Sequence, residues 1–75
     1  MIFLYSLKEC PYCKKVKEIL DEKNLEYKNL DISEDIYKQE LIHLGGKEQV
    51  PFLVDTDKKI SMYESKDIIN YLETL

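Results

Sequence analysis

The two cysteines of this 75-residue chain, Cys10 and Cys13, are separated only by a proline and a tyrosine. Thiols at this spacing can close a disulfide, help to bind a metal ion or carry out thiol-disulfide exchange. A purely structural disulfide is disfavoured, because so short a loop removes little entropy from the unfolded chain. We expect no metal, because zinc would need two more ligands and the only histidine, His43, has no partner at ligand spacing. The pair therefore favours redox catalysis, in which Cys10 is the nucleophile and Cys13 resolves the mixed disulfide.

The residues around the pair predict a helix that begins at the first thiol. Residues 2–7 form an apolar run typical of a buried strand, and apolar residues recur at helical spacing after Pro11. Proline suits a first helical position, where its missing N–H would have had no partner. The unpaired N–H groups and the helix dipole favour a thiolate at this point. Lys8 and Lys14 would stabilise the same negative charge, whereas Glu9 opposes it.

The rest of the chain predicts alternating strands and helices. Strands are expected at residues 2–7, 25–30, 51–54 and 60–63, and helices between residues 11 and 24, 33 and 44, and 65 and 75. Ser33 is expected to be the N-cap of the second helix, and Gly45-Gly46 should end it. One side of that helix is expected to carry Ile36, Tyr37, Glu40, Leu41 and Leu44. The order βαβαββα predicts one α/β domain with a right-handed first crossover.

Composition limits the partners and the compartment. The net charge of -4 disfavours binding to nucleic acid or to an anionic membrane surface. Residues 8–17 are an exception, because four lysines there face one glutamate on an otherwise acidic chain. The apolar start is too short for a signal-peptide core, and no run approaches the roughly 20 residues of a membrane helix. We therefore expect a cytoplasmic protein, in which a close cysteine pair is more often catalytic than structural.

Three stretches resemble glutaredoxins, which are small proteins of the thioredoxin fold. Residues 5–13, YSLKECPYC, resemble the first strand and dithiol site of that family, and Gln49-Val50-Pro51 resembles its Thr-Val-Pro segment. Residues 62–72, MYESKDIINYL, occupy the place of its last glutathione-binding turn and helix, although Glu64-Ser65 is more similar to glutathione transferase N-terminal domains. Leu7 departs from the pattern, because many glutaredoxins carry a lysine at that position.

The resemblance covers essentially the whole chain and implies a fold, a ligand and a set of contacts. The fold would be a thioredoxin-like (glutaredoxin) α/β domain over residues 1–75, with a four-stranded mixed sheet flanked by three helices. Glutathione would be the cosubstrate, with no bound cofactor, and the Val50–Pro51 peptide bond would be cis and face Cys10. The implied substrate-binding residues are Tyr12, Gln49, Val50, Pro51, Glu64 and Ser65.

Three functional interpretations stay open at this point. The first is a glutathione-linked thiol-disulfide oxidoreductase that acts on protein disulfides or glutathione mixed disulfides through Cys10 and Cys13. Its partners would be glutathione, disulfide-containing proteins and a reductase, and it would work as a monomer. The second is a redoxin that is reduced by a flavoprotein reductase of the thioredoxin type. The third is a non-catalytic module that binds glutathione or a metal cluster.

Overall fold

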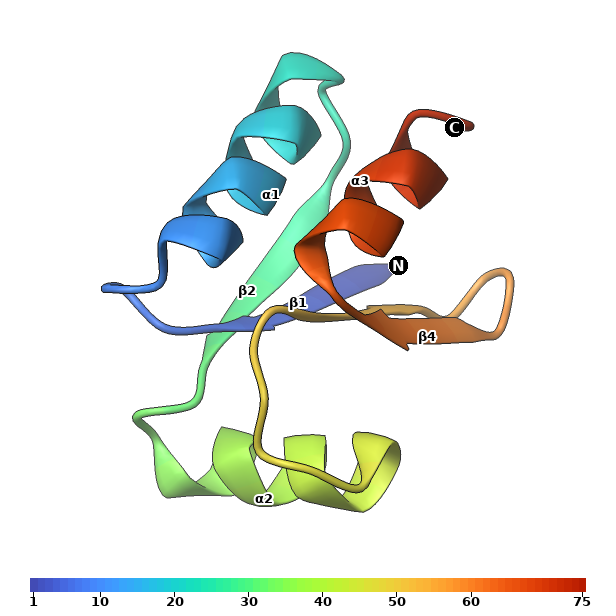
Figure 1. The fold of residues 1–75 in the computed structure, drawn as a ribbon. Helices are drawn as coiled ribbons and strands as arrows, with labels where there is room; N and C mark the ends of the chain where they lie inside the picture. The colour runs from blue at the N-terminus through green and yellow to red at the C-terminus, as the bar shows by residue number, and fades with distance from the viewer.

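Four strands form one mixed sheet in the computed structural model, which describes residues 1–75 (Figure 1). The strands are β1 (Ile2–Ser6), β2 (Tyr27–Asp31), β3 (Phe52–Asp55) and β4 (Ile60–Tyr63), and the helices are α1 (Pro11–Glu22), α2 (Asp35–Gly45) and α3 (Ser65–Leu72). The strand order is β2-β1-β3-β4. β1 pairs in parallel with β2, whereas the β1–β3 and β3–β4 pairs are antiparallel. The predicted fold class and element order are confirmed.

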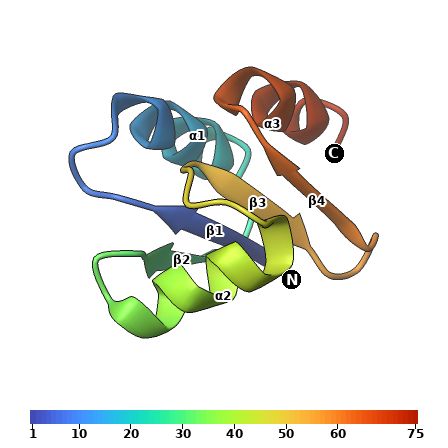
Figure 2. The ribbon, with the colours of Figure 1, turned by 60° about the horizontal axis from the view of Figure 1, so that its bottom comes forward.

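The helices cover both faces of the sheet. α1 and α3 lie side by side on one face, and α2 lies alone on the other (Figures 1 and 2). The parallel pairing of β1 with β2 requires a crossover connection, which α1 provides. None of the three helices has the length and apolar character needed to span a membrane.

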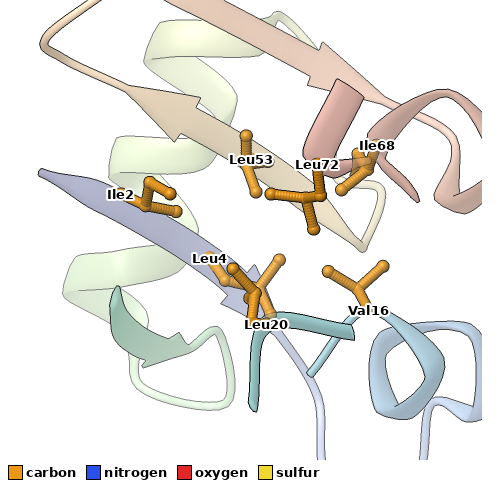
Figure 3. Close-up of a cluster of buried hydrophobic side chains, with 7 residues drawn as sticks. All are labelled: Ile2, Leu4, Val16, Leu20, Leu53, Ile68 and Leu72. Atoms are coloured by element: carbon orange, nitrogen blue, oxygen red, sulfur yellow. The ribbon is translucent and has the colours of Figure 1, made fainter. Parts of the chain in front are cut away.

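Two hydrophobic clusters fill the two layers, because successive side chains of β1 point to opposite faces of the sheet. The larger cluster lies between the sheet and helices α1 and α3 (Figure 3) and consists of Ile2, Leu4, Val16, Leu20, Leu53, Ile68 and Leu72. The smaller cluster lies on the α2 side and consists of Tyr5, Leu30, Ile32, Leu41 and Phe52. β1 contributes to both clusters, so it is the strand that joins the two layers.

Two predictions about α2 are wrong. Glu34, not Ser33, is the N-cap residue, because Ser33 donates its backbone N–H to Asp31 Oδ1 at 2.9 Å in the turn before the helix. Ile36 and Leu44 were expected on one side of the helix with Leu41, but they are 64% and 54% exposed, whereas Leu41 is buried. Ile36 lies five residues before the buried Leu41, a helical rotation that puts it on the far side. Leu44 lies in the last turn of the helix.

The helix ends are closer to expectation. Gly45 and Gly46 end α2, and Gly46 adopts the left-handed conformation with φ of 89°. Asn24 has a positive φ of 54° just after α1, as its place near the predicted helix end suggested. α3 begins at Ser65 but ends at Leu72, so Leu75 lies beyond the helix and is 39% exposed.

A buried acid, Asp55, ties the end of β3 to α3. Its carboxylate accepts hydrogen bonds from the Tyr71 hydroxyl at 2.5 Å and from the Asp57 backbone N–H at 3.1 Å. The Tyr71 hydrogen bond is the main reason that the pKa of Asp55 is lowered. Burial, together with the same hydrogen bond, raises the pKa of Tyr71 to about 12. The pair therefore stabilises the fold only while Asp55 is ionised and Tyr71 is protonated.

Replacing Tyr71 with phenylalanine should destabilise the protein most near neutral pH. The contribution of the pair is complete above the ordinary carboxyl pKa of about 4 and below the ordinary phenol pKa of about 10. It is lost as the pH falls through the lowered pKa of Asp55 or rises through the Tyr71 value of about 12. We expect Tyr71→Phe to lower the free energy of unfolding by about 1–3 kcal/mol at neutral pH, and by less at both extremes. Urea unfolding across the pH range measures this, and a loss independent of pH would contradict the assignment.

Candidate active site

A four-residue turn after β1 brings Cys10 to the start of α1. The Cys10 N–H donates to the Leu7 carbonyl at 3.2 Å, which closes the turn. Cys10 is the N-cap residue with extended backbone angles, and Pro11 occupies the first helical position. The helix start that the sequence predicted at this thiol is confirmed.

The two thiols differ in access and in surroundings. Cys10 is partly exposed, whereas Cys13 is completely buried. The backbone N–H of Cys13 donates to Cys10 Sγ at 3.1 Å, which stabilises negative charge on that sulfur. Burial, followed by the hydrogen bond with Cys10, raises the pKa of Cys13 to about 12. The geometry therefore favours Cys10 as the more reactive sulfur and the protonated form of Cys13.

A pocket of about 490 Å³ opens beside the dithiol turn. Six residues line it, and they are the six that the resemblance implied as substrate contacts: Tyr12, Gln49, Val50, Pro51, Glu64 and Ser65. They come from the start of α1, the segment between α2 and β3, and the start of α3. The Val50–Pro51 peptide bond is cis, as the resemblance implied. The structure brings the six residues together, and their contact with substrate stays a prediction.

Lys8 and Lys14 lie outside this pocket. Both are exposed, and neither forms an ion pair. Lys8 lines a separate, smaller pocket of about 180 Å³ with Leu7, Glu9, Asp31 and Ser33. The Ser33 hydrogen bonds chiefly lower the pKa of Asp31, and the positive charge of Lys8 adds to this effect. Stabilisation of a Cys10 thiolate by the two lysines stays a prediction.

Tyr63 positions the pocket wall, and nothing in the sequence analysis identified it. Its hydroxyl donates to the Lys47 carbonyl at 2.7 Å, and the Lys47 ammonium lies 4.8 Å from the centroid of its ring. The ring also packs on Phe52, with 4.5 Å between centroids. Gly45 makes this approach possible, because a Cβ at that position would lie 2.0 Å from the Tyr63 hydroxyl oxygen. Tyr63 thereby anchors the segment that leads to Val50 and Pro51.

Glu64 joins the two walls of the pocket. Gln49 Nε2 donates to Glu64 Oε2 at 3.4 Å across the opening. Glu64 is the N-cap residue of α3 and has a positive φ of 70°, a conformation that costs about 1–3 kcal/mol for a non-glycine residue and is frequent at functional sites. The first N–H groups of α3 have no helical carbonyl partners, so this wall also offers donors to an anion.

The fold, with Cys10 and Cys13 at the start of α1, places this chain in the thioredoxin-fold class. Residues 4–75 match the family model described as glutathione S-transferase, N-terminal domain, so the chain belongs to that family. Glutaredoxin 1 of Rickettsia felis is 40% identical over 53 residues, which cover 67% of this chain and 52% of that protein. The chain thus spans about half the length of that relative.

Two further comparisons extend over nearly the whole chain. A glutaredoxin-like 8.6 kDa protein in the rubredoxin operon of Clostridium pasteurianum is 31% identical over 72 residues, 96% of both chains. The crystal structure of glutaredoxin 2 from Salmonella typhimurium in complex with glutathione superimposes with a TM-score of 0.83 at 27% identity. It covers 97% of this chain, which corresponds to 33% of that protein. The chain is therefore similar both to glutaredoxins and to glutathione transferase domains.

Alkylation of the reduced protein near neutral pH should modify Cys10 and spare Cys13. Cys13 is fully buried, and its raised pKa of about 12 leaves almost no reactive thiolate. Peptide mass spectrometry after brief treatment with iodoacetamide measures the site of modification. The same treatment in concentrated urea is the control, because both thiols should then react. Modification of the folded protein at Cys13 as fast as at Cys10 would contradict the assignment of the nucleophile.

Tyr63→Phe should loosen the segment before Pro51 without changing the thiols. The variant keeps the ring on Phe52 but loses the hydroxyl that holds Lys47. We expect amide exchange at Gln49, whose N–H donates to the same Lys47 carbonyl, to become about fivefold faster, equivalent to one hydrogen bond of about 1 kcal/mol. Tyr71→Phe is the matched control, because its lost hydroxyl bonds Asp55 instead. Equal effects of the two variants on exchange in this segment would show that Tyr63 acts only through overall stability.

Proposed function

We propose that this protein is a glutathione-linked thiol-disulfide oxidoreductase of the glutaredoxin type. The observation that carries the proposal is the pair of unequal thiols. Cys10 is partly exposed and its sulfur accepts a hydrogen bond from the backbone N–H of the buried Cys13. Tyr12, which lies between the two cysteines in the sequence, lines the adjacent pocket. Its relatives include glutaredoxins, one of them a structure in complex with glutathione. A cytoplasmic setting would keep the thiols of such a protein reduced.

In the first step, the Cys10 thiolate attacks one sulfur of a substrate disulfide. The substrate S–S bond breaks, a Cys10–substrate disulfide forms, and the departing thiolate takes up a proton. The negative charge on Cys10 is then gone. That charge and the Cys10 hydrogen bond are among the causes that raise the pKa of Cys13, so Cys13 loses its proton more readily after the first step than before it.

In the second step, the Cys13 thiolate attacks Cys10 Sγ. The mixed disulfide breaks, the second substrate thiolate leaves, and a Cys10–Cys13 disulfide forms, so the dithiol has given two electrons to the substrate. Two glutathione molecules then reduce this disulfide and leave as glutathione disulfide. When the mixed disulfide already contains glutathione, a second glutathione can attack it directly, and Cys13 is not required.

The pocket would bind the glutathionyl part of the mixed disulfide. The Val50 backbone N–H and C=O would pair with the cysteinyl backbone of glutathione as an added strand does. The Ser65 hydroxyl and the free N–H groups at the start of α3 would bind the γ-glutamyl carboxylate. Glu64, which lines the same wall, has the charge to pair with the ammonium group next to that carboxylate.

The two cysteine variants should separate the two enzymatic interpretations. Cys13→Ser should still remove glutathione from a glutathionylated peptide but lose most reduction of protein disulfides, for which an internal thiol has the advantage of high effective concentration. Cys10→Ser should lose both activities, because the chain holds no other nucleophilic thiol. A glutathione turnover assay coupled to glutathione reductase measures both, and circular dichroism confirms that each variant is folded. Loss of deglutathionylation in folded Cys13→Ser would favour a redoxin served by a flavoprotein reductase.

A further inference from the structure

The N-terminal half of α1 and the turn before it carry lysines that form no ion pairs. We define the lysine face as Lys8, Lys14, Lys15 and Lys17, of which the first three are exposed and Lys17 is partly exposed. The three ion pairs of the structure involve the Met1 ammonium, Lys23 and Lys38, and so none involves this face. Four cations thus lie within ten residues of chain around Cys10 on a protein of net charge -4.

The carboxylates near this face compensate it only in part. Lys8 and Lys17 both contribute to lowering the pKa of Asp31, so that acid offsets these two lysines. Glu9 and Glu18 are exposed neighbours along the chain, but neither forms an ion pair with Lys14 or Lys15. Lys14 and Lys15 therefore keep the most exposed positive charge next to the dithiol.

Lys8 and the glutathione pocket lie on different sides of the Cys10 turn. Lys8 lies near Asp31 at the end of β2, whereas the pocket is formed by the start of α3 and the segment that enters β3. β2 and β3 flank β1 on opposite edges. The pocket lining includes Glu64 and no lysine, so the two surfaces also differ in charge.

Tyr12 lines the pocket, is 61% exposed and lies one helical turn before Lys15 on α1. It is the only exposed large aromatic side chain of the protein and is next to both cysteines in sequence. Exposed tyrosines are frequent anchors of protein interfaces, because they add contact area at a low cost in side-chain entropy. A macromolecular substrate whose disulfide reaches Cys10 would contact Tyr12 and continue over the lysine face.

We propose that the lysine face selects protein substrates in which acidic residues flank the disulfide that Cys10 attacks. This inference rests on the proposed function and uses the same exchange steps, with glutathione as the final reductant. The remainder of the chain carries an excess of negative charge, so an acidic partner is repelled elsewhere and attracted to the side that holds the nucleophile. Exposed charges act mainly on the rate of encounter, so the selection should appear in kcat/KM and weaken with salt.

Three disulfide peptides of one length test this selection. They share the cysteine pair and differ in having acidic, neutral or basic flanking residues. We expect kcat/KM for the acidic peptide to exceed that for the basic one by about tenfold at low ionic strength. The ratio should approach one near 1 M salt, where the screening length is only about 3 Å. Equal kcat/KM values at low salt would overturn the proposal.

Two charge reversals test where the selection arises. Lys15→Glu changes the lysine face at a residue with no role in the proposed chemistry. Lys58→Glu makes the same change in net charge at an exposed site in the turn between β3 and β4. We expect Lys15→Glu to lower the acidic-to-basic ratio of kcat/KM about threefold and Lys58→Glu to leave it unchanged. Equal loss in both variants would overturn the proposal, because net charge alone would then explain the preference.

Two further arms separate other outcomes. A small neutral disulfide, bis(2-hydroxyethyl) disulfide with glutathione, reports the proposed function without the lysine face. If the enzyme turns over this small disulfide but shows no charge preference among the peptides, only this inference is overturned. If it turns over no disulfide at all, the proposed function is overturned as well. An acidic peptide without cysteine should inhibit turnover of the acidic substrate. Equal inhibition by a single-stranded RNA oligonucleotide of the same charge would overturn selection for acidic protein segments.

Discussion

Strand β1 must bury both of its faces while it pairs along both of its edges, and the remaining elements are arranged around that requirement. Leu4 faces the layer of α1 and α3, and Tyr5 faces the layer of α2. Because β2 runs parallel to β1, the chain can reach it only through a crossover connection. β3 runs antiparallel to β1 along its other edge. The crossover helix has to begin close to the end of β1, so Cys10 comes to lie at a helix N-terminus.

Different segments of the chain supply the thiols and the pocket wall of the site. The β1–α1 turn supplies a sulfur that is accessible, and the helix interior supplies a second sulfur that is not. Tyr63 of β4 holds the segment between α2 and β3, because its hydroxyl donates to the Lys47 carbonyl. Because Tyr63 directly precedes Glu64, a single aromatic residue fixes the relative position of two pocket walls. Reactivity and substrate geometry are thus set by separate parts of the fold.

Local patterns in the sequence predicted the strands, the helices and the helix start at Cys10, because each depends on neighbours along the chain. The apolar run before Cys10, the proline after it and the glycines that end α2 all act within a few residues. The environment of Ile36 and Leu44 was predicted wrongly, because composition does not show which way a short helix faces the sheet. The cis bond at Pro51 and the grouping of the six pocket residues came only from the resemblance to glutaredoxins. The contact of Tyr63 with Lys47 joins residues 16 positions apart and has no local signal.

The close approach of Gly45 and Tyr63 also limits how chains of this fold can diverge. A side chain at position 45 and a tyrosine at position 63 would occupy the same space, because the first added carbon already overlaps the phenol oxygen. A substitution at either position therefore changes which residues the other accepts. In sequences descended from a common ancestor, these two positions should covary, with glycine retained wherever the tyrosine is present and larger residues admitted only after the ring is lost.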